Sequence, residues 1–347
     1  MKRYEGNPII TPADVKPSRE DFEVVCVFNC GVTKFEDETL LLMRVAEVPK
    51  NDNPDVFLAP MLDAQTNELI IKSYDKTDKS IDFSDSRFVI TPDDRVLTSI
   101  SHFRIARSKD GFNFVIDEKP AMYPCNKYER FGIEDPRITR IDDTYYINYS
   151  ACSNVTGVTT NLASTKDFKT FTRHGVIFTP DNKDVAIFPE KINGKYIAFN
   201  RPASAEYGMR DMWISESDNL VYWGNHKQFM GGTKESWDGG RIGCSAVPFR
   251  TEKGWIEIYH AADESDRYCL GALLLDLEDP TKIIARSRGP IIEPTEDYEV
   301  HGFYGNVIFN CGVLPEDDGT VKIYYGAADT CIAYAETTVD EILEMML

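Results

Sequence analysis

Basic residues, long apolar runs and close cysteine pairs are all scarce in this sequence of 347 residues. It has 38 lysines and arginines against 57 acidic residues, so its formal net charge is −19. An acidic balance of this size argues against nucleic acid and against an anionic membrane surface as partners. No apolar run reaches the roughly 18 residues of a membrane-spanning helix, so no membrane segment is expected.

The eight cysteines form no Cys-x-x-Cys pair, and the N-terminal residues lack the apolar centre of a secretory signal. We therefore expect free, mostly buried thiols in a cytoplasmic protein. Five scattered histidines predict no metal site. Phosphate-binding loops, dinucleotide-binding glycine motifs, zinc-protease motifs and the nucleophile elbow of serine hydrolases are also absent from the sequence.

What the sequence has instead is a set of short aromatic and β-branched stretches divided by polar turns, which is typical of β-strands. Five segments repeat one plan, in which an apolar strand, a charged or glycine-bearing turn and an aromatic strand follow one another. They start at Val27, Gly132, Ile187, Ile242 and Ile308. Similar turns recur between them, at 106–112, 163–168 and 215–220. This recurrence predicts an all-β fold, a five-bladed β-propeller, in preference to a β-sandwich.

The polar linkers around 49–54 and 75–85 are too short to separate domains, so residues 1–347 are expected to form a single propeller domain. At the C-terminus, residues 337–347 begin with an N-cap candidate and continue with acidic and apolar residues. This pattern predicts a short C-terminal helix.

In a propeller, each blade's innermost strand starts near the central axis, and its second strand ends there. At the start of the innermost strands the repeats place Asn29, Asp135, Glu190, Ser245 and Asn310. At the end of the second strands they place Arg44, Ser150, Arg201, His260 and Gly326. So many polar residues converging on one axis favour a binding pocket over separate capping of each strand in water.

Asp135 is the first catalytic candidate. It lies in the stretch Gly-Ile-Glu-Asp-Pro-Arg at 132–137, at the start of an innermost strand. A carboxyl held against apolar strand residues can have a raised pKa and act as a general acid. An ion pair to Arg137 that only ties the turn explains the same residues equally well, so both interpretations stay open.

Four basic residues at strand ends or turns form a candidate anion site, namely Lys183, Arg201, Arg241 and His260. Arginine can bind phosphate through two parallel hydrogen bonds. The alternative is solvated surface charge, which suits Lys109, Lys166 and Lys253 better because they lie in evident turns.

With these motifs the sequence resembles glycoside hydrolase family 130, the β-mannoside phosphorylases and their hydrolytic relatives, along essentially its whole length. The resemblance rests on stretches at 4–10, 14–18, 42–47, 132–137, 182–185, 188–194, 268–272 and 324–330. The first of these and residues 182–185 are most similar to members that act on β-1,2-linked mannosides. The resemblance implies a five-bladed propeller whose single catalytic carboxyl is the Asp of the Glu-Asp-Pro-Arg motif, which is Asp135 in this chain.

The resemblance further implies phosphorolysis with inversion. Asp135 would protonate the glycosidic oxygen through the mannosyl C3 hydroxyl, and inorganic phosphate would attack the anomeric carbon to give α-mannose 1-phosphate. The implied phosphate ligands are Lys183, Arg201, Arg241 and His260, and the implied mannosyl ligands are Asn29, Arg44 and Asp329. The partners would be a β-mannoside oligosaccharide and phosphate as co-substrate, with no other cofactor.

Two alternatives accompany this interpretation. An inverting β-1,2-mannosidase would need a second carboxylate about 6.5–9.5 Å from the acid, and Glu190 is the candidate for it. Retention of four basic residues favours the phosphorylase instead, because phosphate must be bound. A non-catalytic sugar-binding propeller is the second alternative, but it would need neither Asp135 nor the basic set.

The chain departs from related sequences at Asn200, Cys244, Ser245 and Ala261, which are expected to line the pocket. Loops at 47–55 and 231–239 are expected to govern the preferred chain length. The sequence is also compatible with a homo-oligomer in which a neighbour's N-terminal arm or C-terminal helix closes the pocket.

Overall fold

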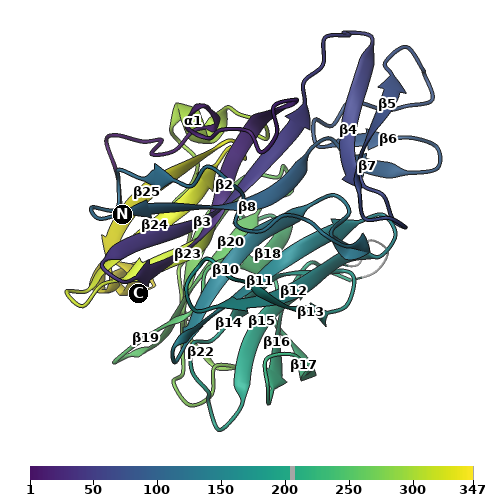
Figure 1. Cartoon of the computed structure of the whole chain (residues 1–347). Helices are drawn as coiled ribbons and strands as arrows, with labels where there is room; N and C mark the ends of the chain where they lie inside the picture. Colours follow the sequence, from purple (N-terminus) through teal and green to yellow (C-terminus); the bar gives the residue numbers. More distant parts are fainter. Residues whose placement is uncertain (204–207, 347) are drawn as a thin grey trace.

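The computed structural model describes residues 1–203 and 208–346. Within these residues, five antiparallel sheets follow one another around an axis, with most neighbouring innermost strands in contact, as a five-bladed propeller (Figure 1). The all-β fold class expected from the repeats is therefore confirmed. No helix in this part of the chain is long and apolar enough to cross a membrane.

The blades follow one another along the chain. Blade 1 contains β2 (Phe22–Phe35), β3 (Glu38–Pro49), β8 (Ile100–Ser108) and β9 (Val115–Ile116). Blade 2 contains β10 (Ile133–Ile141), β11 (Thr144–Ser153), β12 (Gly157–Thr165) and β13 (Thr172–Phe178). Blade 3 contains β14 (Asn182–Ile187), β15 (Tyr196–Pro202), β16 (Met212–Ser217) and β17 (Trp223–Met230). Blade 4 contains β18 (Arg241–Cys244), β19 (Phe249–Thr251), β20 (Gly254–Ala262), β21 (Tyr268–Leu275) and β22 (Ile283–Arg286).

Blade 5 joins the two ends of the chain. It contains β23 (Ile308–Pro315), β24 (Thr320–Ala327), β25 (Cys331–Thr338) and the N-terminal strand β1 (Lys2–Arg3). The pairing of β1 with β25 completes the last blade with residues from the start of the chain. This closes the ring and protects an edge that would otherwise be unpaired.

Two hairpins stand apart from the blades, between β3 and β8 (Figure 1). They are β4 (Val56–Leu62) with β5 (Leu69–Asp75), and β6 (Phe88–Ile90) with β7 (Arg95–Leu97). Short helical segments occur at Pro12–Asp14, Lys127–Glu129 and α1 (Asp297–Val300). The expected C-terminal helix is present as α2 (Val339–Glu344), where Glu341 N donates to the N-cap hydroxyl of Thr338.

The hydrophobic core is divided between neighbouring blades, because the sheets are apolar on the faces that pack together. One cluster packs Val27 and Met43 of blade 1 against Tyr324 and Ile332 of blade 5. Others pair the remaining blades in the same way. The axis itself is thereby left to polar side chains.

The strand register confirms the expected second-strand ends. Arg44, Ser150, Arg201, His260 and Gly326 lie opposite Phe28, Glu134, Lys183, Gly243 and Phe309. The five residues are therefore equivalent positions of the five blades.

The expected position of Glu190 is wrong. The innermost strand of blade 3 is β14, which begins at Asn182, so Asp184 occupies the place assigned to Glu190. The misplacement arose because Ile187 and Phe188 mark the far end of this strand, whereas Ile308 and Phe309 mark the start of β23.

Candidate active site

Three innermost strands carry the same irregularity where they approach the axis. Asn29, Asp135 and Asp184 have left-handed φ angles of 45°, 52° and 52°, and a β-bulge interrupts the register at each. Asparagine and aspartate adopt this conformation more readily than other residues with a side chain. A bulge changes the direction in which a side chain points, so the same local distortion redirects Asn29, Asp135 and Asp184 in three blades.

A cavity of about 210 Å³ opens among these strands. Six of the eight site residues expected from the sequence line it, namely Asn29, Arg44, Asp135, Lys183, Arg241 and Asp329. The other two, Arg201 and His260, are buried in an adjoining polar network. The structure thus brings the expected site residues together from all five blades.

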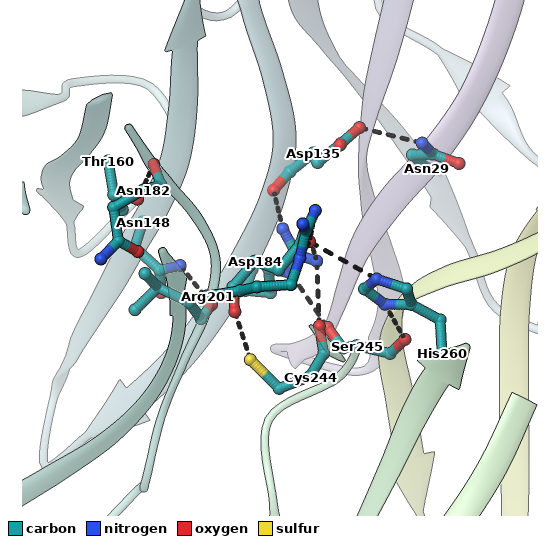
Figure 2. Close-up of polar contacts among 12 residues, drawn as sticks. Asn29, Asp135, Asn148, Thr160, Asn182, Asp184, Arg201, Cys244, Ser245 and His260 are labelled. Atoms are coloured by element: carbon teal, nitrogen blue, oxygen red, sulfur yellow. Dashed lines mark hydrogen bonds and ion pairs between the residues drawn. The ribbon is translucent and has the colours of Figure 1, made fainter. Parts of the chain in front are cut away.

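The buried carboxyl of Asp135 accepts two hydrogen bonds at Oδ1. Asn29 Nδ2 donates at 2.9 Å (Figure 2), and Arg44 Nη1 donates at 3.0 Å. Burial alone would raise the pKa of Asp135, but the charges of Arg44 and Lys183 outweigh it and lower the pKa. The raised pKa expected from the sequence is therefore wrong, because the surrounding charges favour the anionic carboxylate.

Among the described residues, Arg137 forms no hydrogen bond or ion pair with the side-chain carboxyl of Asp135. Its Nε donates to the Ser245 carbonyl at 2.9 Å, and its Nη1 donates to the backbone carbonyl of Asp135 at 3.0 Å. The alternative in which Asp135 serves only as the ion-pair partner of Arg137 is thereby excluded. Arg137 holds the backbone of the bulge and leaves the carboxyl to face the cavity.

Arg44 joins two carboxylates at the cavity wall. Its Nη2 donates to Glu134 Oε1 at 2.8 Å while Nη1 contacts Asp135, and its guanidinium lies 4.4 Å from the centre of the Phe28 ring. On the same wall, burial raises the pKa of Asp329 to about 6, against the lowering effect of Arg44. Asp329 can therefore accept or donate a hydrogen bond near neutral pH.

Asp184 is the centre of a buried network (Figure 2). It directly follows Lys183 in the chain, and its charge raises the pKa of Lys183 against the effect of burial. Its Oδ2 lies 2.6 Å from Arg201 Nη2 and 3.4 Å from His260 Nε2. Its Oδ1 lies 3.4 Å from Arg137 Nη2. Burial would raise the pKa of Asp184, but Arg201 above all lowers it well below its usual value. One carboxylate therefore orients three nitrogen-bearing side chains.

His260 is neutral in this network. Burial, aided by the charge of Arg201, lowers its pKa to about 4 despite the opposing effect of Asp184. Its inclusion among the cations was therefore wrong, although a neutral imidazole still donates a hydrogen bond. Gly243 allows it to pack closely, since a Cβ at Gly243 would lie 2.7 Å from His260 Cε1 and 3.1 Å from Arg201 Nε.

Lys183 and Arg241 are the members of the expected phosphate set that line the cavity. Arg241 Nη1 donates to the Tyr268 hydroxyl at 2.8 Å, and its Nη2 pairs with Asp266. Its Nε is buried and has no hydrogen-bond partner among the described residues.

The positions that depart from related sequences do not line the cavity as expected. The Cys244 thiol donates to the Asp184 backbone carbonyl, and the Ser245 hydroxyl lies 3.0 Å from His260 Nδ1. Asn200 bonds instead to Asn182 and Ser215, and Ala261 is buried between blades 3 and 4. Cys244 and Ser245 thus contact Asp184 and His260 within the buried network and are not part of the cavity wall.

Glu190 is distant from this chemistry, which corrects its role as candidate base. Its side chain is 46% exposed and pairs with Arg250 on the outside of the propeller. We expect Glu190→Gln to change kcat by no more than about twofold, because surface ion pairs contribute little. Initial rates of sugar release check this, and a loss beyond tenfold would restore Glu190 as a base.

Sequence reasoning missed three residues at the site, Asp184, Glu134 and Arg87. Asp184 could have been found by aligning Lys183-Asp184 of blade 3 with Glu134-Asp135 of blade 2, because the second residue of each pair is the bulged aspartate. The loops at 47–55 and 231–239 contribute no residue to the described cavity lining; the segments outside the innermost strands that do contribute include 87–88, 97–99, 303–304 and 307.

Comparison with known proteins places these observations in a family. A profile of glycoside hydrolase family 130, described as beta-1,4-mannooligosaccharide phosphorylase, matches residues 86–347. A beta-1,2-mannobiose phosphorylase of Listeria innocua is 48% identical over 99% of this chain and 98% of its own length. A 1,2-beta-oligomannan phosphorylase of Thermoanaerobacter is 43% identical over 71% of this chain and 79% of its own length.

A solved structure supports the same assignment. The Listeria innocua beta-1,2-mannobiose phosphorylase in complex with beta-1,2-mannobiose superposes with a TM-score of 0.96, covering 99% of this chain and 98% of that one. The agreement extends over the whole propeller and both of its additional hairpins. This chain belongs to glycoside hydrolase family 130.

Proposed function

We propose that this protein is an inverting phosphorylase that converts β-1,2-linked mannobiose and short mannooligosaccharides into α-mannose 1-phosphate and a shortened sugar. The observation that carries the proposal is the meeting of one hydrogen-bonded carboxyl, Asp135, with Lys183 and Arg241 in a single cavity. The β-1,2 linkage is supported by the activities named for the similar proteins of Listeria innocua and Thermoanaerobacter.

The chemistry follows from this arrangement. Asn29, Arg44 and Asp329 hold hydroxyls of the mannosyl ring, and Asp135 provides the proton. The proton passes through the C3 hydroxyl to the glycosidic oxygen as the C1–O bond breaks, and a phosphate oxygen bonds to C1 from the opposite face. Configuration is therefore inverted, and the proton leaves on the new hydroxyl of the shortened sugar.

Phosphate binding also helps to protonate Asp135. The charge of Lys183 is among the causes of the lowered pKa of Asp135. A phosphate anion bound to Lys183 and Arg241 compensates that charge, so the proton affinity of the carboxyl rises when the nucleophile is in place. Phosphate acts as co-substrate, and the proposal requires no other cofactor.

The hydrogen-bonded network completes the phosphate site. Asp184 holds Arg201 and His260 next to Lys183, with the imidazole as a neutral donor. All eight cysteines lie in the described residues as free thiols, which supports a cytoplasmic location for the proposed enzyme.

The decisive experiment incubates the protein with β-1,2-mannobiose, with and without inorganic phosphate, and measures α-mannose 1-phosphate. We expect product only when phosphate is present, and β-1,4-mannobiose serves as the linkage control. Release of free mannose regardless of phosphate would identify a hydrolase. Sugar binding without turnover would identify a non-catalytic module.

A further inference from the structure

The segment between β3 and β8 emerges on the side of the propeller that carries the cavity. Second strands end at the cavity, as Arg44 shows in blade 1, so the connection to the third strand begins there. In blades 2, 4 and 5 that connection is residues 154–156, 263–267 and 328–330. In blade 1 it is residues 50–99, which contain β4 to β7 (Figure 1). Blade 1 therefore adds a large structure to the rim of the site.

The β6–β7 hairpin reaches the cavity directly. Arg87, Phe88 and residues 97–99 line it, and so do residues 303–304 from the connection between α1 and β23. The Ser86 hydroxyl donates to the Phe303 carbonyl at 3.1 Å, and the Thr98 hydroxyl donates to the Ser86 carbonyl at 2.8 Å. The first bond ties the hairpin to the segment that precedes β23, and the second joins the two ends of the hairpin to each other.

Arg87 is held in one orientation at this wall. Its Nε and Nη2 donate to Asp85 at 3.0 and 2.8 Å, and its guanidinium lies 4.0 Å from the centre of the Tyr304 ring. Nη1 has no hydrogen-bond partner among residues 1–203 and 208–346. A fixed guanidinium with a donor to spare beside aromatic rings is well suited to a neutral sugar.

We propose, on the basis of the proposed function, that the β6–β7 hairpin forms the acceptor wall of the site and that Arg87 Nη1 donates to the leaving sugar. The proposed mannosyl ligands Asn29, Arg44 and Asp329 and the phosphate ligands Lys183 and Arg241 come from other parts of the cavity wall, which leaves the hairpin for the sugar beyond the scissile bond. Arg87 is thus a residue that determines acceptor specificity.

The test uses the synthetic direction, with α-mannose 1-phosphate as donor and either mannose or β-1,2-mannobiose as acceptor. For Arg87→Ala we expect the acceptor KM to rise roughly 10- to 100-fold, as for loss of a hydrogen bond to a charged donor. The KM for α-mannose 1-phosphate, and the KM for phosphate in phosphorolysis, are expected to change by less than about threefold.

Arg95→Ala is the matched control. Arg95 lies on the same hairpin, 3.6 Å from the centre of the Phe88 ring, but does not line the cavity. Equal increases of the acceptor KM in both variants would show general loosening of the hairpin and overturn the specific role of Arg87. If Arg87→Ala fails to fold, Arg87→Gln gives the same comparison with the side-chain length retained.

Two further outcomes would contradict the acceptor role of Arg87 and leave the proposed phosphorylase function unaffected. An increase of the phosphate KM with an unchanged acceptor KM would make Arg87 a phosphate ligand. Unchanged KM values for all substrates would remove it from the site. If the unaltered protein produces no mannose 1-phosphate in the first place, it is the proposed function that fails.

Discussion

Replacement of Asp135 by asparagine is expected to lower kcat for phosphorolysis by roughly 10²- to 10⁴-fold, the usual contribution of a general acid. Asparagine has the same shape and can still accept the hydrogen bond from Asn29, so the bulge at position 135 is retained. The release of α-mannose 1-phosphate from β-1,2-mannobiose measures the loss, and a thermal unfolding curve shows that the fold persists.

A donor that needs no protonation separates acid catalysis from other roles of Asp135. An aryl β-mannoside with an acidic phenol leaves as the phenolate, so Asp135→Asn should cleave it far closer to the unaltered rate than it cleaves mannobiose. Glu190→Gln is the control, since that carboxyl lies on the outer surface. Equal losses on both donors would mean that Asp135 positions the sugar and does not protonate it.

The repeated architecture could be predicted from the sequence because each strand has a recognisable local pattern of apolar, aromatic and β-branched residues between polar turns. Aromatic second strands recur in blades 2 to 5, and the register places Arg44, Arg201 and His260 at equivalent ends. The local pattern led to a wrong position for Glu190, because the apolar residues used to align the repeats lie at the end of β14 but at the start of β23. The bulge at Asp184 depends on the pairing of β14 with β15, so it could be inferred only by comparison with the bulge at Asp135 in blade 2 and not from the strand's own sequence.

Electrostatics could not be predicted because they depend on which charges burial brings together. The sequence indicated an apolar setting for Asp135, but three blades supply cations around it and lower its pKa. Similarly, His260 belongs to a basic set by residue type yet is neutral when buried beside Arg201. The cavity-lining hairpin was missed for another reason, since residues 50–99 lie outside the repeat and carry no motif.

Asp184→Asn is the second change with a large expected effect, and it acts on stability as well as on phosphate. The substitution leaves Arg201 and Arg137 buried without their shared carboxylate. Breaking a buried ion pair from one side costs about 3–5 kcal/mol. Denaturant unfolding of the variant should therefore show a loss of this order. Asp218→Asn is the matched control, because its pair with Lys195 is solvent-exposed and is worth about 0–1 kcal/mol.

Phosphate should distinguish a positioning role of Asp184 from a purely structural one. In the variant, Arg201 and His260 lose the carboxylate that orients them, so phosphate binds more weakly and added phosphate should stabilise Asp184→Asn less than it stabilises the unaltered protein. The same unfolding experiment, repeated over a series of phosphate concentrations with chloride as the ionic-strength control, measures this difference. The phosphate KM is expected to change more than the KM for mannobiose, because Asn29, Arg44 and Asp329 are untouched. Equal stabilisation of both proteins by phosphate would show that Asp184 does not orient the phosphate ligands, even if the variant is less stable.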